Sequence, residues 1–442
     1  MTRLNILNLS HLGFSGAALR THEGAPAVPI DAEAQLRRAV LACMLWENQF
    51  YEDGVTIAER IAALVPRVEA AQVTALAIEA REQMKLRHAP LLLVREMARY
   101  ATHRGLVAET LARVIQRADE LTEFLAIYWK DGRQPLAAQV KKGLAAAFTR
   151  FNAYALAKYD RAGAVKLRDV LFLTHAKPLT AEQALMWRRL IDGSLPVPDT
   201  WEVRLSRGEQ KREAWESLLR ENRLGALALL RNLRNMHTAG VEPALVRFAL
   251  EAIRVERVLP FRFIAAARHA PQWEPWIEQA MFASLHGQSR LAGRIALLVD
   301  VSGSMDAPLS SRSEMVRMDA AAGLAVLLRE IAEEVSVFTF SDRLKAVPAR
   351  RGFALRDAIV HSQPHGGTQL GKALNELREG CDRLIVITDE QSHDRVPAPR
   401  GRGYVINVAS YRNGIGYGPW THIDGWSEAV IEYIRSHEQM YA

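Results

Sequence analysis

The sequence predicts a multidomain protein in which a long all-α region precedes an α/β domain with a doubly wound sheet. Amphipathic helical segments without any strand pattern run from residue 31 to about residue 290. From residue 291, short apolar runs alternate with helical segments, which is typical of a parallel sheet covered on both faces. A chain of 442 residues is also too long for one ordinary hydrophobic core.

The N-terminal part divides into an irregular arm over residues 1–30, rich in Gly and Pro, and an all-α domain over residues 31–290. Helices are expected at about residues 31–46, 55–64, 66–83, 89–102, 105–117, 119–129, 135–159, 167–174, 180–192, 209–220, 223–235, 242–255, 260–269 and 273–285. No repeat of fixed period is present, so a stack of helix pairs and a compact helical bundle both remain open.

The C-terminal domain is predicted over residues 291–442. Its expected strands are 295–299, 335–340, 383–388 and 404–409, and its expected helices are 313–334, 352–361, 369–380 and 426–437. Sheets of this kind bind ligands at the carboxyl ends of their strands. Asp300 and Asp389 both lie at such ends, so we expect a site there.

The location and redox state of the chain follow from apolar runs and cysteines. No apolar run approaches the roughly 20 residues that span a bilayer, and the N-terminus lacks the pattern of a secretion signal. We therefore expect a soluble, cytoplasmic protein with no membrane partner. Cys43 and Cys381 lie far apart without neighbouring ligand residues, so reduced core thiols are expected rather than a disulfide or zinc site.

The charge is unevenly distributed along the chain, whose formal net charge is +7. Residues 1–290 carry 40 Lys and Arg against 31 Asp and Glu, whereas residues 291–442 carry 17 against 19. A basic region beside a slightly acidic one indicates an anionic polymer as the partner of the N-terminal part. An Arg-rich solvated helical surface is the alternative explanation.

Three polar segments supply a candidate metal site. Asp300, Ser302 and Ser304 alternate after an apolar strand, so their side chains can converge on one side of an extended loop. Thr368 follows two glycines at a helix start, and Asp389 follows the buried strand ending at residue 388. Carboxylate and hydroxyl oxygens suit Mg²⁺ or another divalent cation. We find no placed nucleophile or base, so no catalytic residue is assigned and no enzymatic activity is expected.

This pattern, Asp-x-Ser-x-Ser followed by Thr and Asp, resembles the metal-ion-dependent adhesion site (MIDAS) of von Willebrand factor A domains. The resemblance covers about residues 291–442. It implies that the metal serves protein contact and that a carboxylate of an unknown acidic protein ligand completes its shell.

Four ordered blocks in the helical region resemble the TROVE module: Lys158-Tyr159, 169–178, 225–236 and 258–265. Followed by a von Willebrand A domain, this order is similar to the Ro ribonucleoprotein autoantigen family and its bacterial orthologues. The resemblance implies a ring of HEAT-like repeats that binds Y RNA outside and single-stranded 3′ ends of misfolded or fragmentary RNA in its hole. It implies a scaffold in RNA quality control, processing or repair, with an exonuclease or repair enzyme as partner.

Basic residues provide the candidate RNA contacts. By position, Lys158 and His175 match residues that the family uses for Y RNA, although residues 160–165 replace the family's basic cluster and Gly-Trp. Nearby tyrosines and tryptophans could stack on unpaired bases, although such residues in helices are more often core. The candidate RNA-binding residues are Lys141, Lys142, Lys158, Arg161, Arg168, His175, Lys177, Arg231 and Arg234.

The sequence therefore favours a monomeric, non-catalytic protein that binds non-coding RNA. One alternative is a metal-dependent adaptor of the von Willebrand A type that serves an AAA+ ATPase. A second is a metal-dependent RNA hydrolase. The chain has no Gly-x-x-x-x-Gly-Lys-Ser/Thr loop, which argues against its being an ATPase itself.

Overall fold

The computed structural model describes residues 28–29, 31–41, 54–160, 163–206, 210–255, 258, 261–286, 289–309, 314–378, 380–409, 415–424 and 429–440. The chain divides into two compact units. One consists of residues Ala58–Glu209, and the other consists of Met1–Ile57 together with Gln210–Ala442. The boundaries predicted at residues 31 and 291 fall inside the second unit and stay predictions.

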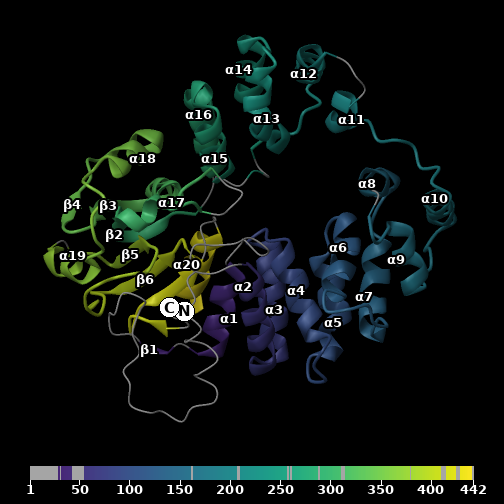
Figure 1. Cartoon of the computed structure of the whole chain (residues 1–442), viewed down its shortest axis with the longest axis horizontal. Coiled ribbons are helices and arrows are strands. Elements are labelled where there is room, and N and C mark those ends of the chain that lie inside the picture. The colour runs from purple at the N-terminus through teal and green to yellow at the C-terminus, as the bar shows by residue number, and fades with distance from the viewer. Residues whose placement is uncertain are drawn as a thin grey trace. The chain divides into compact units, whose positions relative to one another are not determined.

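The unit Ala58–Glu209 consists of stacked helices, drawn in blue in Figure 1. Helix α3 packs on α4 and α5, α4 on α6, α5 on α7, and α7 on α9. The helices are α3 (Ala70–Glu82), α4 (His88–Met97), α5 (Val107–Val114), α6 (Asp119–Tyr128), α7 (Ala138–Phe148), α8 (Ala153–Tyr159), α9 (Leu167–Thr174), α10 (Ala181–Ile191) and α11 (Trp201–Ser206), with α2 (Gly54–Leu64) crossing the division.

A buried ion pair joins α3 to α6 in this stack. Arg81 Nη2 lies 2.7 Å from Glu120 Oε1, and the Glu120 side chain is fully buried. The other oxygen of Glu120 accepts hydrogen bonds from the backbone N–H groups of Gln116 (2.8 Å) and Arg117 (3.0 Å). A buried charge is tolerated when its lone pairs are satisfied in this way.

One predicted helix, residues 135–159, is two helices in the structure. α7 ends at Phe148 and α8 begins at Ala153. The Asn152 side chain accepts a hydrogen bond from the backbone N–H of Ala155 (2.9 Å), which satisfies one of the donors left open at the start of α8. The prediction of a continuous helix was wrong because this capping residue was overlooked.

The second unit combines further helices with a sheet. The helices are α1 (Ala32–Leu41), α12 (Lys211–Arg220), α13 (Ala226–Thr238), α14 (Pro243–Glu251), α15 (Phe261–His269), α16 (Glu274–Leu285), α17 (Arg317–Ile331), α18 (Gly352–Val360), α19 (Leu370–Glu376) and α20 (Ala429–Met440). The 3₁₀ segments of the two units are Val65–Arg67, Arg104–Leu106, Pro271–Trp273 and Gly303–Asp306.

A six-stranded sheet in the order β4-β3-β2-β5-β6-β8 forms the centre of this unit. All of its pairings are parallel except that of β4 with β3, so the predicted α/β sheet is confirmed. The strands are β2 (Leu291–Asp300), β3 (Ala332–Phe340), β4 (Leu344–Ala346), β5 (Arg383–Thr388), β6 (Arg402–Asn407) and β8 (Thr421–Asp424). The two-residue strands β1 (Val28–Pro29) and β7 (Ile415–Gly416) pair antiparallel with each other.

Helices cover both faces of the sheet. α19 packs on one face, where Leu370 and Leu374 join a core with Leu298 and Val386. α17 contacts β2 and also α15, α16 and α18, and it is buried along nearly its whole length. A helix enclosed on several sides needs small residues, which explains the run of alanines at 320–322.

The N-terminal helix α1 belongs to the same unit. It contacts β8, and the buried side chain of Arg38 pairs with the buried carboxylate of Glu390. Glu390 also accepts a hydrogen bond from Asn407 Nδ2 (2.9 Å) and pairs with His422. Residues 31–41 are therefore tied to the α/β sheet by a buried polar cluster.

Two smaller predictions can be compared with the structure. Cys381 is a thiol partly buried against the α19 side of the core, whereas Cys43 lies outside the described residues. Among the residues that the structure describes, no helix is both long and apolar enough to cross a membrane.

Replacing Gly371 with alanine is expected to lower the free energy of unfolding by about 1–3 kcal/mol. A Cβ atom at this position would lie 2.0 Å from the carbonyl oxygen of Arg395, which is backbone and cannot rotate away. Urea denaturation of the variant measures the loss. Gly105→Ala is the matched control, because nothing lies within 4 Å of its added Cβ. Equal denaturation midpoints for the two variants would contradict the close packing of α19.

Candidate metal centre and nucleic-acid interface

Two aspartates lie together at the carboxyl edge of the sheet. β2 ends at Asp300, and Asp389 directly follows β5, the parallel neighbour of β2. Both carboxylates are fully buried. Thr388 Oγ1 donates a hydrogen bond to Asp300 Oδ2 (2.6 Å), which fixes the orientation of that carboxylate.

The loop after β2 directs its hydroxyls toward one point. The backbone N–H of Ser302 donates to Asp300 Oδ1 (2.8 Å), and the hydroxyl oxygens of Ser302 and Ser304 lie 3.2 Å apart. The backbone N–H of Gly303 donates to the carbonyl oxygen of Gly366 (3.0 Å), so this loop is joined to the segment that carries Thr368.

The glycines before Thr368 leave room for a close neighbour, the side chain of Asp342. A Cβ atom at Gly366 would lie 2.0 Å from Asp342 Oδ2, and the Gly367 N–H donates to Asp342 Oδ1 (3.0 Å). Thr368 itself is buried, and its carbonyl oxygen accepts a hydrogen bond from the backbone N–H of His393 (3.0 Å). Backbone hydrogen bonds thus hold Thr368 on a loop beside the serine loop.

Arg317, at the start of α17, is a component of this site that the sequence did not reveal. Its Nη1 lies 3.1 Å from Asp389 Oδ2 and 3.3 Å from the carbonyl oxygen of Ser304. The Arg317 side chain is 2% exposed. Because the positive charge is fixed next to Asp389, it partly neutralises the site before any ion binds.

The electrostatics of the site favour binding of a cation. Burial, together with the neighbouring charge of Asp389, raises the pKa of Asp300 to about 7, although hydrogen bonds from Ser302 and Thr388 oppose the shift. In the described part of the chain, no group of three His, Cys, Asp or Glu side chains is placed to hold a metal. The serine and threonine hydroxyls would therefore have to complete any ligand set with the two aspartates, as Mg²⁺ permits.

The candidate RNA-binding residues between α7 and the turn after α9 are mostly exposed. Lys142, Arg168, His175 and Lys177 are exposed, whereas Lys141 and Lys158 are partly exposed. Arg161 lies outside the described residues. His175 has a left-handed backbone (φ 54°) at the end of α9, where the helix stops.

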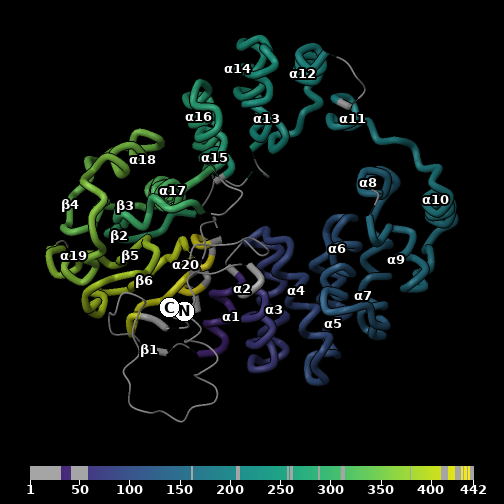
Figure 2. Tube along the Cα trace, in the orientation of Figure 1, coloured from purple at the N-terminus to yellow at the C-terminus, as the bar shows by residue number. Residues whose placement is uncertain are grey.

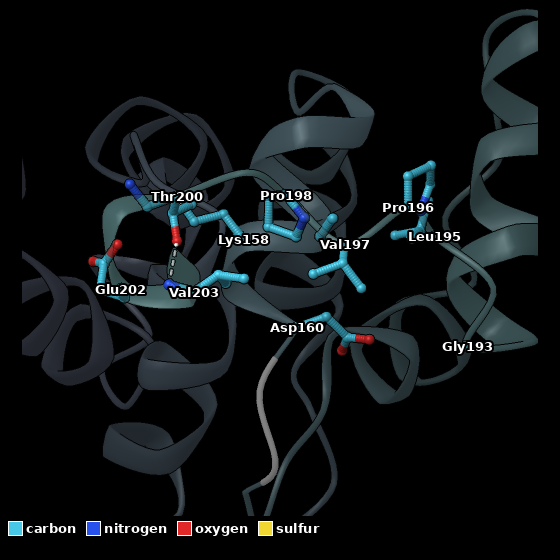
Figure 3. A pocket seen from close by; sticks show the side chains of 11 residues that line it. Lys158, Asp160, Gly193, Leu195, Pro196, Val197, Pro198, Thr200, Glu202 and Val203 are labelled. Carbon is cyan, nitrogen blue, oxygen red and sulfur yellow. Dashed lines mark hydrogen bonds between the residues drawn. The ribbon is translucent and has the colours of Figure 1, made fainter. Parts of the chain in front are cut away.

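Lys158 borders a cavity of about 700 Å³ that also contains carboxylates (Figure 3). Asp160 and Glu202 line it together with the Leu195–Pro198 segment. Burial raises the pKa of Asp160, although Lys166 and Arg168 oppose the rise. One cation beside two carboxylates does not favour a phosphate inside this cavity.

The aromatic residues of this region divide into core and surface. Tyr128 is buried, whereas Tyr154 is 54% exposed. Trp129 lines a cavity of about 340 Å³ with Lys141 and Arg133, and the Arg133 guanidinium lies 5.1 Å from its ring centroid. Tyr159 is partly exposed, and Arg117 and Lys158 lie over its ring. Tyr154, Trp129 and Tyr159 are therefore the residues of this group that could stack on a base.

The basic face of α13 is exposed as its spacing predicts. Arg231 and Arg234 are exposed, whereas Leu229, Leu233 and Met236 on the opposite face are buried. Arg234 Nη1 lies 3.3 Å from Glu314 Oε1, and both side chains are exposed. Arg231 and Arg234 therefore both face solvent, and an exposed pair such as that of Arg234 with Glu314 contributes little.

The comparisons with known proteins agree with this arrangement. The TROVE domain model matches residues 193–275. The chain is also similar in structure to the crystal structure of the Deinococcus radiodurans RO (RSR) protein, with 20% sequence identity and a TM-score of 0.63 over 92% of this chain and 99% of that chain. Residues 193–275 thus match the TROVE model, and the chain has the fold of the RO (RSR) protein. The predicted family resemblance is confirmed, and no curated protein gives a significant match.

The TROVE match lies largely downstream of the predicted Y RNA residues. It begins after α10 and extends through α11 to the start of α16. Part of this TROVE segment surrounds an open cavity between α12, α13 and α14, whose lining residues were not among the candidates. Arg220, Arg223 and Arg254 lie there, and two helices, α13 and α14, separate Arg223 from Arg254 in sequence, so no local spacing signalled their convergence.

Proposed function

We propose that this TROVE-domain protein binds non-coding RNA and acts as a scaffold without catalysing a reaction. The observation that carries the proposal is the set of exposed or partly exposed basic residues on α8, α9 and the turn that follows: Lys158, Arg168, His175 and Lys177. Exposed cations neutralise phosphates and release counterions, which is the main source of RNA affinity. The TROVE match and the Ro fold support the same function.

The RNA is proposed to be of two kinds. A structured RNA of the Y type would contact the α8–α9 cations, and single-stranded 3′ ends of misfolded or fragmentary RNA would be bound elsewhere on the helical region. Such a protein would present its RNA to an exonuclease or a repair enzyme. In this proposal the helices form HEAT-like repeats and the α/β domain is of the von Willebrand A type.

The aspartate and hydroxyl site is proposed to hold Mg²⁺ for protein contact. Asp300, Ser302, Ser304, Thr368 and Asp389 would be the ligands, and the ion would supply a position for a carboxylate of a partner protein. The burial of both aspartates and the raised pKa of Asp300 support this role, because a divalent ion would compensate their charge. If protein contact at this site were the main activity, the chain would be an adaptor instead.

A comparison of two variants tests the RNA-binding proposal. The double change Lys158→Ala with His175→Ala should weaken binding of a structured hairpin RNA roughly ten-fold, because two phosphate contacts are lost. Asp300→Ala should leave hairpin affinity nearly unchanged. The measurement is a filter-binding titration of the full chain with magnesium present.

The control replaces an exposed Lys and His of the α/β domain, Lys345→Ala with His361→Ala, and should leave hairpin affinity unchanged. If Asp300→Ala weakened binding more than the Lys158 and His175 change, the adaptor reading would be favoured. Shortening of the RNA by the parent protein, abolished by Asp389→Ala, would show that the protein is an RNA hydrolase.

A further inference from the structure

An open apolar cavity of about 460 Å³ lies between α12, α13 and α14. These helices follow one another in the teal part of the trace in Figure 2, and α14 contacts both α12 and α13. Apolar side chains form most of its lining, including Leu218, Leu229 and Ile253. The volume falls within the range of cavities that hold small organic groups.

A phenylalanine at this cavity is exposed without an apparent structural reason. Phe248 lines the cavity, and the residue is 68% exposed. Val246 and Leu250, on the same helix, are each 1% exposed and provide the contacts that hold α14 in place. The ring of Phe248 is therefore dispensable for packing and available to a ligand with a flat apolar face.

The polar residues of the lining are all donors of hydrogen bonds, and three of them are cations. Arg220, Arg223, Arg254 and Asn222 line the cavity, and the lining contains no carboxylate. Asn222 has a left-handed backbone (φ 50°), a conformation that asparagine tolerates better than most residues. An anionic ligand with a ring thus meets complementary charge at this cavity.

Nearby carboxylates do not cancel this charge. Arg220 Nη2 lies 2.8 Å from Glu216 Oε2, and Arg223 Nη1 lies 3.9 Å from Glu221 Oε2. Glu216 is buried, but it also pairs with Arg212, so its charge is shared between two arginines. Arg220, Arg223 and Glu221 are exposed, and surface pairs of this kind contribute little. Arg254 is exposed and adds a third cation. By contrast, the cavity beside Lys158 has one cation and two carboxylates.

We propose that the α12–α14 cavity binds one unpaired base of single-stranded RNA, with Phe248 stacked on the base. Arg220, Arg223 and Arg254 bind the adjoining phosphates. The side-chain amide of Asn222, which also lines the cavity, forms hydrogen bonds with the edge of the base. A base paired in a duplex cannot enter, so the cavity selects single strands. This inference rests on the proposed RNA-binding function and assigns a separate site to its single-stranded ligand.

The test uses the full chain and a fluorescent ten-nucleotide oligouridine that contains one 4-thiouridine. Phe248→Ala should weaken binding of this strand roughly ten-fold, since one base stack is lost. Its binding of a hairpin RNA and its thermal unfolding midpoint should be unchanged. Irradiation of the parent complex should crosslink 4-thiouridine to the peptide that contains Phe248.

Two arginines of the same segment provide a matched charge control. Arg254→Gln should weaken oligouridine binding several-fold, because Arg254 lines the cavity. Arg247→Gln removes another exposed charge, which pairs with Glu251 outside the lining, and it should have no effect. Equal losses in both variants would indicate a diffuse electrostatic effect and overturn the proposal.

Two further outcomes distinguish failure of this proposed site from failure of the proposed RNA-binding function. If the parent binds oligouridine and Phe248→Ala binds it equally well, the cavity does not hold a base and would suit an apolar side chain of a protein. If the parent binds neither oligouridine nor hairpin RNA, the RNA-binding function itself is wrong.

Discussion

Replacing Arg317 with methionine is expected to lower the free energy of unfolding of the metal-free protein by about 3–5 kcal/mol. The guanidinium is buried and lies 3.1 Å from the fully buried carboxylate of Asp389. Removing the arginine would leave a buried negative charge next to Asp300, which is far more costly than losing a surface ion pair. Urea denaturation in EDTA measures the effect.

The effect of added magnesium on the stability of Arg317→Met tests the candidate metal site. Because the variant lacks the fixed cation beside Asp389, an added divalent ion should stabilise Arg317→Met more than it stabilises the parent. Arg329→Met, a partly exposed arginine on the same helix, is the control and should change stability by no more than about 0.5 kcal/mol. Parent-like stability of Arg317→Met in EDTA would refute the buried ion pair.

The metal-free protein is expected to lose about 2 kcal/mol of stability from Asp300 between pH 5.5 and pH 8. The pKa of Asp300 is raised from 3.8 to about 7 by burial and by the charge of Asp389. A carboxyl whose pKa is higher in the folded state binds its proton more tightly there. Its contribution is therefore fullest below about pH 4 and disappears as the pH rises through 7.

Asp300→Asn isolates this contribution from other groups that titrate in the same range, such as His365, whose pKa is raised by Asp306. The difference in unfolding free energy between parent and Asp300→Asn should change with pH in EDTA. Magnesium should reduce that change, because a bound ion replaces the proton as the compensating charge. A difference that is constant from pH 5.5 to pH 8 would show that Asp300 is ionised throughout.

The sequence predicted that the candidate site lies at the carboxyl edge of the sheet, but it did not predict the buried arginine inside the site. Apolar runs that end in Asp300 and Asp389 mark strand ends, and parallel pairing of β2 with β5 places both residues at one edge. The buried arginine could not be anticipated, because Arg317 stands in a helical segment whose charged residues are usually solvated. Its partner, Asp389, is 72 residues away in sequence.

Short elements at the sheet margins were also missed. β4 has three residues and pairs antiparallel with β3, and β8 has four residues just before α20. Segments of this length carry too few alternations to show a period, so only the pairing defines them. α11, with six residues, was missed for the same reason.

The α12–α14 cavity could not be predicted from the sequence for a different reason. The sequence indicates that α14 is amphipathic, yet it cannot show that Phe248 faces solvent while Val246 and Leu250 face the core. Exposure of a large apolar residue depends on which neighbouring helices cover it. The predicted basic residues of α7 to α9 were easier to place, because long charged side chains are rarely buried.

Salt dependence of RNA binding tests the central claim of this account most directly. The full chain is titrated with a labelled single-stranded RNA that has a free 3′ end, at 50 mM and at 200 mM salt. About four phosphate contacts predict an affinity roughly 50-fold weaker at the higher salt. An affinity unchanged between the two salt concentrations would contradict RNA binding through the exposed cations.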